Sequence, residues 1–142
     1  KEAVEMTAHN AKQNGLAVEA VEADVFDFLT ELDKKKDHSY DYIVLDPPAF
    51  TKSGKTVHEA FRGYKEINYR AMKILPRGGY LATCSCSHFM GEELFVKMVK
   101  EAARDAGVTL RQIEFRQQAP DHPILMTVPE TYYLKFFLFQ IV

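Results

Sequence analysis

Apolar and polar residues follow two alternating spacings along this 142-residue chain. Four segments carry apolar residues at roughly helical spacing and are predicted to be helices: residues 1–13, 26–35, 64–75 and 92–106. Five shorter, apolar-rich segments are predicted to be strands: residues 18–23, 40–45, 80–83, 109–115 and 132–142. The order α-β-α-β-α-β-α-β-β favours an α/β fold, with helices on both faces of a parallel sheet and an antiparallel last strand.

The sharpest candidate for chemistry is the acidic corner Asp46-Pro47-Pro48, which ends the predicted strand at residues 40–45. Ligands bind beyond the carboxyl ends of parallel strands, so this corner is well placed for a site. The prolines fix the backbone, and the carboxylate and nearby carbonyl oxygens can accept hydrogen bonds from the donor edge of a planar base. Phe50 can stack on that base, a contact worth roughly 1–3 kcal/mol. The alternative is a plain turn that ends a strand.

The only two cysteines, Cys84 and Cys86, lie at the end of the next predicted strand. A thiolate is a strong nucleophile, and here it would face the same crevice as Asp46. Cys84 continues the strand and is predicted to be a small buried hydrophobe, whereas Cys86 lies beyond the strand between two serines. One Cys-x-Cys pair without further ligands does not predict a metal site.

Asp24 is the third candidate at a strand end, because it follows the predicted strand at residues 18–23. Its carboxylate can accept a hydrogen bond from the amino group of an adenine ring. The alternative is the N-cap of the helix at residues 26–35, a role that Asp27 can equally fill.

Basic residues near the acidic corner form a possible contact surface for phosphates. Arg62 opens the predicted helix at its amino end, and Lys52, Lys55 and Lys65 lie close to it in sequence. A solvated start of a helix explains these charges equally well. Residues 121–123, Asp-His-Pro, have the residue types of a catalytic dyad, but these residues more often form a turn.

Composition limits the class of protein. Hydrophobic residues make up 46% and charged residues 27% of the chain, as in an ordinary globular domain. The 18 basic and 20 acidic residues give a net charge of −2, so a nucleic-acid partner would be gripped mainly by another segment. No apolar run approaches 18 residues, which predicts no membrane partner, and the two cysteines favour a reducing cytoplasm.

Several ordered motifs resemble one family. They are Asp46-Pro-Pro-Ala-Phe, Arg62-Gly-Tyr-Lys-Glu-Ile-Asn, Gly78-Gly79, Thr83-Cys-Ser-Cys-Ser, Asp121-His-Pro and Pro129-Glu-Thr-Tyr-Tyr-Leu-Lys. The chain resembles the class I S-adenosylmethionine-dependent methyltransferases that form 5-methylcytosine in large-subunit ribosomal RNA, and the resemblance covers nearly its whole length. It implies a Rossmann-like sheet, S-adenosylmethionine as cofactor, ribosomal RNA as partner and a separate RNA-binding domain.

The resemblance also implies roles for individual residues. Cys86 matches the catalytic nucleophile, and Asp46 matches a catalytic residue that also lies beside the cofactor. Asp24 matches the acidic residue near the cofactor's adenine. The target-base pocket corresponds to Pro47, Pro48, Phe50 and Arg62. Two other functions stay open: methylation of an exocyclic amine, which needs no cysteine, and a binding module without catalysis.

One departure from the family changes the expectation for this chain. The family's first two strands, with the Gly-rich loop that cradles the cofactor, precede the segment that begins at Lys1. Residues 1–142 are therefore interpreted as a partial methyltransferase domain that binds little cofactor and is inactive by itself. The gap in the sheet is expected either to close by direct pairing of this chain's first two strands or to leave a free edge through which copies associate.

Overall fold

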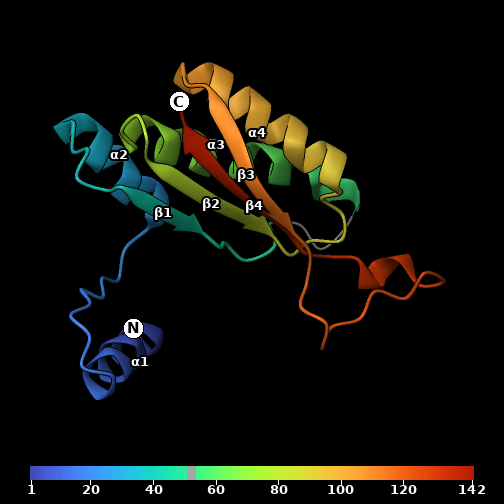
Figure 1. Ribbon diagram of the computed structural model, residues 1–142, viewed down its shortest axis with the longest axis horizontal. Helices are drawn as coiled ribbons and strands as arrows, with labels where there is room; N and C mark the ends of the chain where they lie inside the picture. The colour runs from blue at the N-terminus through green and yellow to red at the C-terminus, as the bar shows by residue number, and fades with distance from the viewer. Residues whose placement is uncertain (51–53) are drawn as a thin grey trace.

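The computed structural model describes residues 1–50 and 54–142 and contains one mixed sheet beside a layer of helices (Figure 1). The strands lie in the order β1-β2-β4-β3. Their bounds are β1 Tyr42–Leu45, β2 Tyr80–Ser85, β3 Leu110–Arg116 and β4 Lys135–Ile141. β1 pairs with β2 in parallel, and β4 is antiparallel to both β2 and β3. The α/β class and the antiparallel last strand are thus confirmed.

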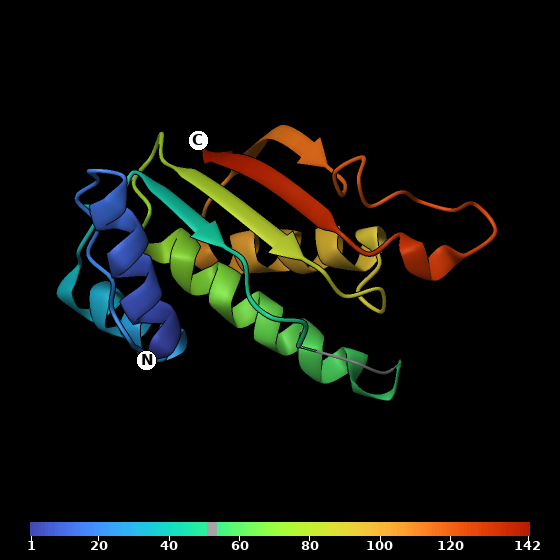
Figure 2. The same cartoon turned by 90° about the horizontal axis from the view of Figure 1, so that it is seen from below.

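Three helices cover one face of this sheet, as Figure 2 shows from the side. They are α2 Val25–Lys35, α3 Val57–Ile74 and α4 Glu92–Ala106. A fourth helix, α1 Glu2–Gln13, lies apart from the sheet in both views. Two 3-10 turns, Gly54–Thr56 and Pro129–Thr131, complete the regular structure of the described residues.

The core lies between the three helices and the covered face of the sheet. On α3 the buried residues recur every three or four positions, which turns one stripe of the helix inward. On β4 every second residue is buried, so one side of the strand faces the helices. The largest apolar side chains that are almost fully buried come from both layers: Tyr64, Met72, Ile74, Leu81, Met90, Phe95 and Met98.

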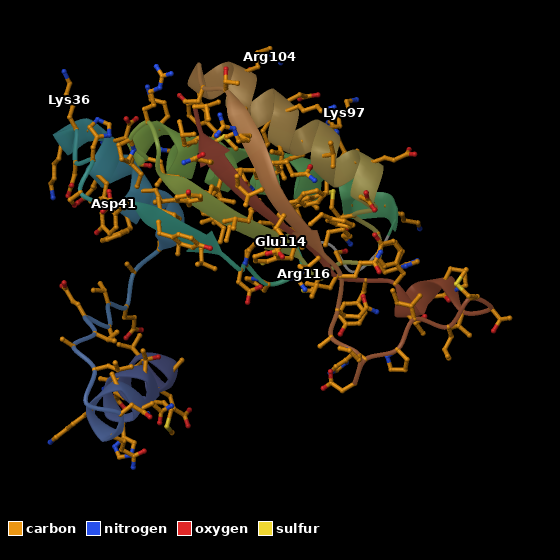
Figure 3. The ribbon with its side chains drawn as sticks, viewed as in Figure 1. Lys36, Asp41, Lys97, Arg104, Glu114 and Arg116 are labelled. Carbon is orange, nitrogen blue, oxygen red and sulfur yellow. The ribbon has the colours of Figure 1, made fainter. Side chains whose placement is uncertain are left out.

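The opposite face of the sheet differs from the prediction of helices on both faces. Tyr42, Val44 and Ile113 are 50%, 60% and 48% exposed, so no described helix covers them. On the β3 side of this face, the side chains of Glu114 and Arg116 pair with each other (Figure 3). Figure 3 also places Lys97 and Arg104 on α4, which packs on the other side of the sheet. The chain therefore forms two layers.

The predicted strand at residues 18–23 is not formed, and this part of the prediction was wrong. No helix or strand covers residues 16–24, and the side chains of Leu16, Val18 and Val21 are exposed. A strand needs a neighbour for its backbone hydrogen bonds, and no described strand lies beside this segment. The gap therefore does not close by pairing of the first two predicted strands. β1 has β2 as its one partner among the described residues, and association through its other edge stays a prediction.

Two local differences have clear causes. The helix predicted from residue 64 begins at Val57, because the apolar spacing extends through Ala60 and Gly63 lies inside the helix. The imperfect alternation in the β3 segment comes from a register shift between Gln112 and Glu114. No helix in the described part of the chain is long and apolar enough to cross a membrane.

We expect Asp24→Ala to lower the free energy of unfolding by about 1 kcal/mol, the usual effect of losing an N-cap. Its Oδ1 atom accepts hydrogen bonds from the backbone N–H groups of Phe26 (2.9 Å) and Asp27 (3.2 Å) at the start of α2. Asp24→Ser is the matched control, since serine is also a good cap. Urea denaturation measures both variants, and equal losses would contradict the capping role.

Candidate active site

The parallel pair β1 and β2 brings the acidic corner and the cysteines to one edge of the sheet. Leu45 is in register with Thr83, so Asp46 follows β1 at the level where Cys84 stands in β2. Adjacent strands lie about 4.8 Å apart, which makes these two strand ends close neighbours. The side chain of Asp46 is exposed, so its carboxylate is available to a ligand at this edge.

The two cysteines have opposite environments. Cys84 is 8% exposed, and burial raises the pKa of its thiol to about 11, with the negative charges of Asp46 and Cys86 adding to the shift. Cys86 is exposed and lies immediately beyond the end of β2. A buried thiol with a raised pKa is a poor nucleophile at neutral pH, whereas an accessible one can reach a ligand. The burial predicted for Cys84 is therefore found, and Cys86 is the accessible thiol.

A tyrosine that the sequence reasoning missed connects the two strand ends. The hydroxyl of Tyr64, on α3, accepts a hydrogen bond from Ser85 Oγ at 3.0 Å and interacts with the backbone of Phe50. Its ring meets the Phe50 ring edge-on, with 4.6 Å between centroids. Burial raises the pKa of Tyr64. The signal in the sequence was a tyrosine on the apolar stripe of a helix, where a buried hydroxyl needs partners.

The acidic corner also borders a hollow of about 560 Å³. Its lining comes from the start of α2, the end of β1 and the middle of α3: Ala23, Asp24, Val25, Phe26, Val44, Leu45, Asp46, Pro47, Pro48, Phe50 and Ile67. Five of the residues predicted for the site thus meet in one place. Cys86 and Arg62 are not part of this lining.

Two predicted ligand contacts have structural roles as well. Asp24 caps α2 through Oδ1, as the alternative interpretation held, and no described residue donates a hydrogen bond to its Oδ2. Phe50 is half-buried, and its ring packs beside Tyr64 and over Gly63. Both side chains therefore border the hollow while they stabilise its walls.

The predicted basic patch is only partly assembled. Lys65 Nζ pairs with Asp105 (2.7 Å) and Glu101 (3.4 Å) on α4, so it stabilises the packing of two helices. Arg62 is exposed on α3, about two turns from the start of that helix. Lys52 lies outside the described residues.

The Asp121-His122 pair does not form a catalytic dyad with the other candidates. Both side chains are exposed in the loop before β4, and their closest charged atoms are 3.8 Å apart. His122 Nδ1 lies 3.2 Å from the hydroxyl of Tyr133. Among the described residues, no three His, Cys, Asp or Glu side chains are grouped so that they could hold a metal ion.

A second unforeseen residue is Lys135, which is 1% exposed at the start of β4. Its ammonium donates hydrogen bonds to the carbonyl oxygens of Ser87 (2.6 Å) and Tyr133 (2.7 Å). Burial lowers the pKa of Lys135 to about 8, and the charge of Cys86 acts in the opposite direction. The sequence signal was a single lysine inside an otherwise apolar strand.

Comparison with known proteins relates the chain to methyltransferases. Residues 1–110 match the family described as Methyltransferase small domain. The Ribosomal RNA large subunit methyltransferase I of Aeromonas salmonicida (strain A449) is 44% identical over 136 residues, which cover 94% of this chain and 34% of that protein. The protein of the same name from Klebsiella pneumoniae (strain 342) is 41% identical over 140 residues, covering 96% and 35%. The chain spans about a third of the length of these relatives.

Solved structures support the same assignment at the level of the fold. SMU.776, in a crystal structure complexed with SAH, has a TM-score of 0.81 at 20% identity, covering 99% of this chain and 37% of that chain. A DNA modification methylase from Thermus thermophilus, complexed with S-adenosyl-L-methionine, has a TM-score of 0.51 at 12% identity, covering 84% and 53%. These likenesses confirm the predicted Rossmann-like methyltransferase fold. Since the family match covers most of the chain, the chain belongs to the Methyltransferase small domain family.

Proposed function

We propose that this chain is the catalytic part of an S-adenosylmethionine-dependent methyltransferase that forms 5-methylcytosine in large-subunit ribosomal RNA through a covalent adduct with Cys86. The observation that carries the proposal is the position of an exposed thiol beside the Asp46-Pro47-Pro48 corner, at one edge of a parallel strand pair. The names of the relatives support ribosomal RNA as the substrate, and such a substrate places the enzyme in the cytoplasm.

The residues around the hollow fit the adenosyl end of S-adenosylmethionine. The rings of Phe26 and Phe50 and the ring of Pro47 offer apolar walls to a purine. Oδ2 of Asp24 can accept a hydrogen bond from the adenine amino group while Oδ1 caps α2. Asp46, exposed at the rim, can balance the positive charge of the ligand.

The proposed mechanism assigns separate tasks to the two strand ends. Cys86 attacks carbon 6 of the cytosine, and the electrons of the 5,6 double bond make carbon 5 nucleophilic. The cofactor supplies the methyl group that carbon 5 receives. Loss of the proton on carbon 5 restores the double bond and expels the thiolate of Cys86. Asp46 and the carbonyl oxygens of Pro47 and Pro48 hold the base by its donor edge during these steps.

The target base must leave its stack to reach this edge, since neither Cys86 nor Asp46 can approach carbon 5 or carbon 6 inside a helix. Phe50 and Arg62 are proposed to contact the extruded nucleotide, the ring by stacking and the guanidinium through phosphate. With a net charge of −2, this chain contributes little general attraction to RNA. Segments of the protein beyond the family domain are therefore proposed to hold the ribosomal RNA.

We expect Cys86→Ala to lower the rate of carbon-5 methylation by about 10³-fold or more, because the attacking atom is removed. Cys84→Ala is the matched control and should keep most of the activity, since that thiol is buried. The measurement is methyl transfer to ribosomal RNA by a protein of full family length that carries this chain, with the product nucleoside identified by mass spectrometry. Unchanged transfer by Cys86→Ala, with the methyl group on an exocyclic amine, would assign the chain to the amine methyltransferases.

A second expectation concerns the cofactor. Asp24→Ser keeps a capping oxygen but removes the carboxylate from the hollow, so affinity for S-adenosylmethionine should fall about 10-fold or more, as for one lost charge-assisted hydrogen bond. The stability of the variant should stay close to that of the unmodified protein. Calorimetric titration of the same full-length protein gives the affinity, and an unchanged value would remove Asp24 from the cofactor site.

A further inference from the structure

We propose that Lys135 is a positioning residue for Cys86: its ammonium fixes the backbone that carries the thiol and stabilises the thiolate from within the fold. This inference rests on the proposed role of Cys86 as the nucleophile. It concerns the thiol itself, however, so it can be tested without methyl transfer.

The first argument is the anchoring of both neighbours of Cys86. Ser85, on one side, is fully buried and donates to the Tyr64 hydroxyl. Ser87, on the other side, is 3% exposed, and its carbonyl oxygen accepts the 2.6 Å hydrogen bond from Lys135. The exposed thiol therefore stands between two fixed residues, one held by a helix and the other by β4. Such support limits the positions that the sulfur can take.

The second argument is the environment of the ammonium. Lys135 directs two hydrogen bonds to carbonyl oxygens and makes no ion pair with any carboxylate of the described chain. A buried cation without an anion is costly, and lysine is seldom retained in such a place unless it has a partner. The charge that acts favourably on Lys135 is that of Cys86. The cation is thus balanced only when the thiol is ionised.

The third argument comes from the other charged groups around the thiol. Asp46 at the end of β1 is negative and opposes a thiolate, whereas Tyr64 on α3 and Cys84 on β2 are neutral at pH 7 because burial raises the pKa of each. Before β4, His122 lies against the Tyr133 hydroxyl, next to the exposed Asp121. Lys135 is the buried cation of this group, so it is the residue that can offset Asp46 when the thiolate forms.

The test is the rate of alkylation of Cys86 by iodoacetamide as a function of pH, followed by peptide mass spectrometry on the 142-residue chain. Lys135→Met removes the charge and both hydrogen bonds, while Lys135→Gln removes the charge but keeps a donor. In both variants the pH midpoint of alkylation should rise by about one unit, which lowers the rate at pH 7 about 10-fold. Lys97→Met, on the exposed side of α4, is the control and should leave the midpoint unchanged.

A midpoint in Lys135→Gln equal to that of the unmodified chain would overturn the proposal. A reciprocal measurement serves if substitutions of the buried lysine prevent folding, because Cys86 is exposed and tolerant of change. In Cys86→Ser the pH midpoint of Lys135, followed by NMR of its labelled ε-carbon, should fall below the value in the unmodified chain. An unchanged midpoint would also overturn the proposal.

The two proposals can fail separately. A full-length Cys86→Ala protein that still methylates RNA would end the covalent mechanism, while the link between the ammonium and the thiol would stand on the alkylation and NMR data. Conversely, an inactive Cys86→Ala protein together with unchanged midpoints would leave the nucleophile in place and reduce Lys135 to a structural residue.

Discussion

The parallel pairing of β1 with β2 is the constraint on which the candidate site depends. Four residue pairs connect these strands, from Tyr42 with Tyr80 to Leu45 with Thr83. Since both strands run in the same direction, their carboxyl ends stop at one edge, and the polar residues that follow them become neighbours. A register shift of one residue would reverse the faces on which the side chains lie and would separate the acidic corner from the accessible thiol.

The layer of helices secures this edge from below. α3 supplies Tyr64, whose hydroxyl reaches Ser85 at the end of β2 and whose ring packs against Phe50 beyond the end of β1. α4 is held to α3 by buried apolar contacts and by the charges around Lys65. The site is therefore supported from the core, while its outer residues stay open to a ligand. This division agrees with the general requirement that reactive groups be held by rigid neighbours.

The sequence predicted the parts of the fold that depend on local pattern. Strongly periodic helices and apolar strands were identified, and Asp46 and Cys86 were assigned to strand ends, where the structure places them. The segment at residues 18–23 was mispredicted because its apolar residues suit a strand, yet a strand forms only where a neighbour satisfies its backbone. Tyr64 and Lys135 were missed because their importance comes from tertiary contacts. Hydrogen bonds from Ser85 and to Ser87 join elements far apart in the chain, and no local pattern encodes them.

The position of α1 has a consequence for the local stability of the chain. This helix has 12 residues, buries only Ala11, and has an ion pair between the amino group of Lys1 and Glu22. An isolated helix of that length is marginal in water, since most helical stability comes from packing an apolar face. Amide protons in α1 should therefore exchange with solvent much faster than those in α3, which lies in the core. The chain thus has a rigid unit built on the sheet and an amino-terminal helix that unfolds and refolds independently of it.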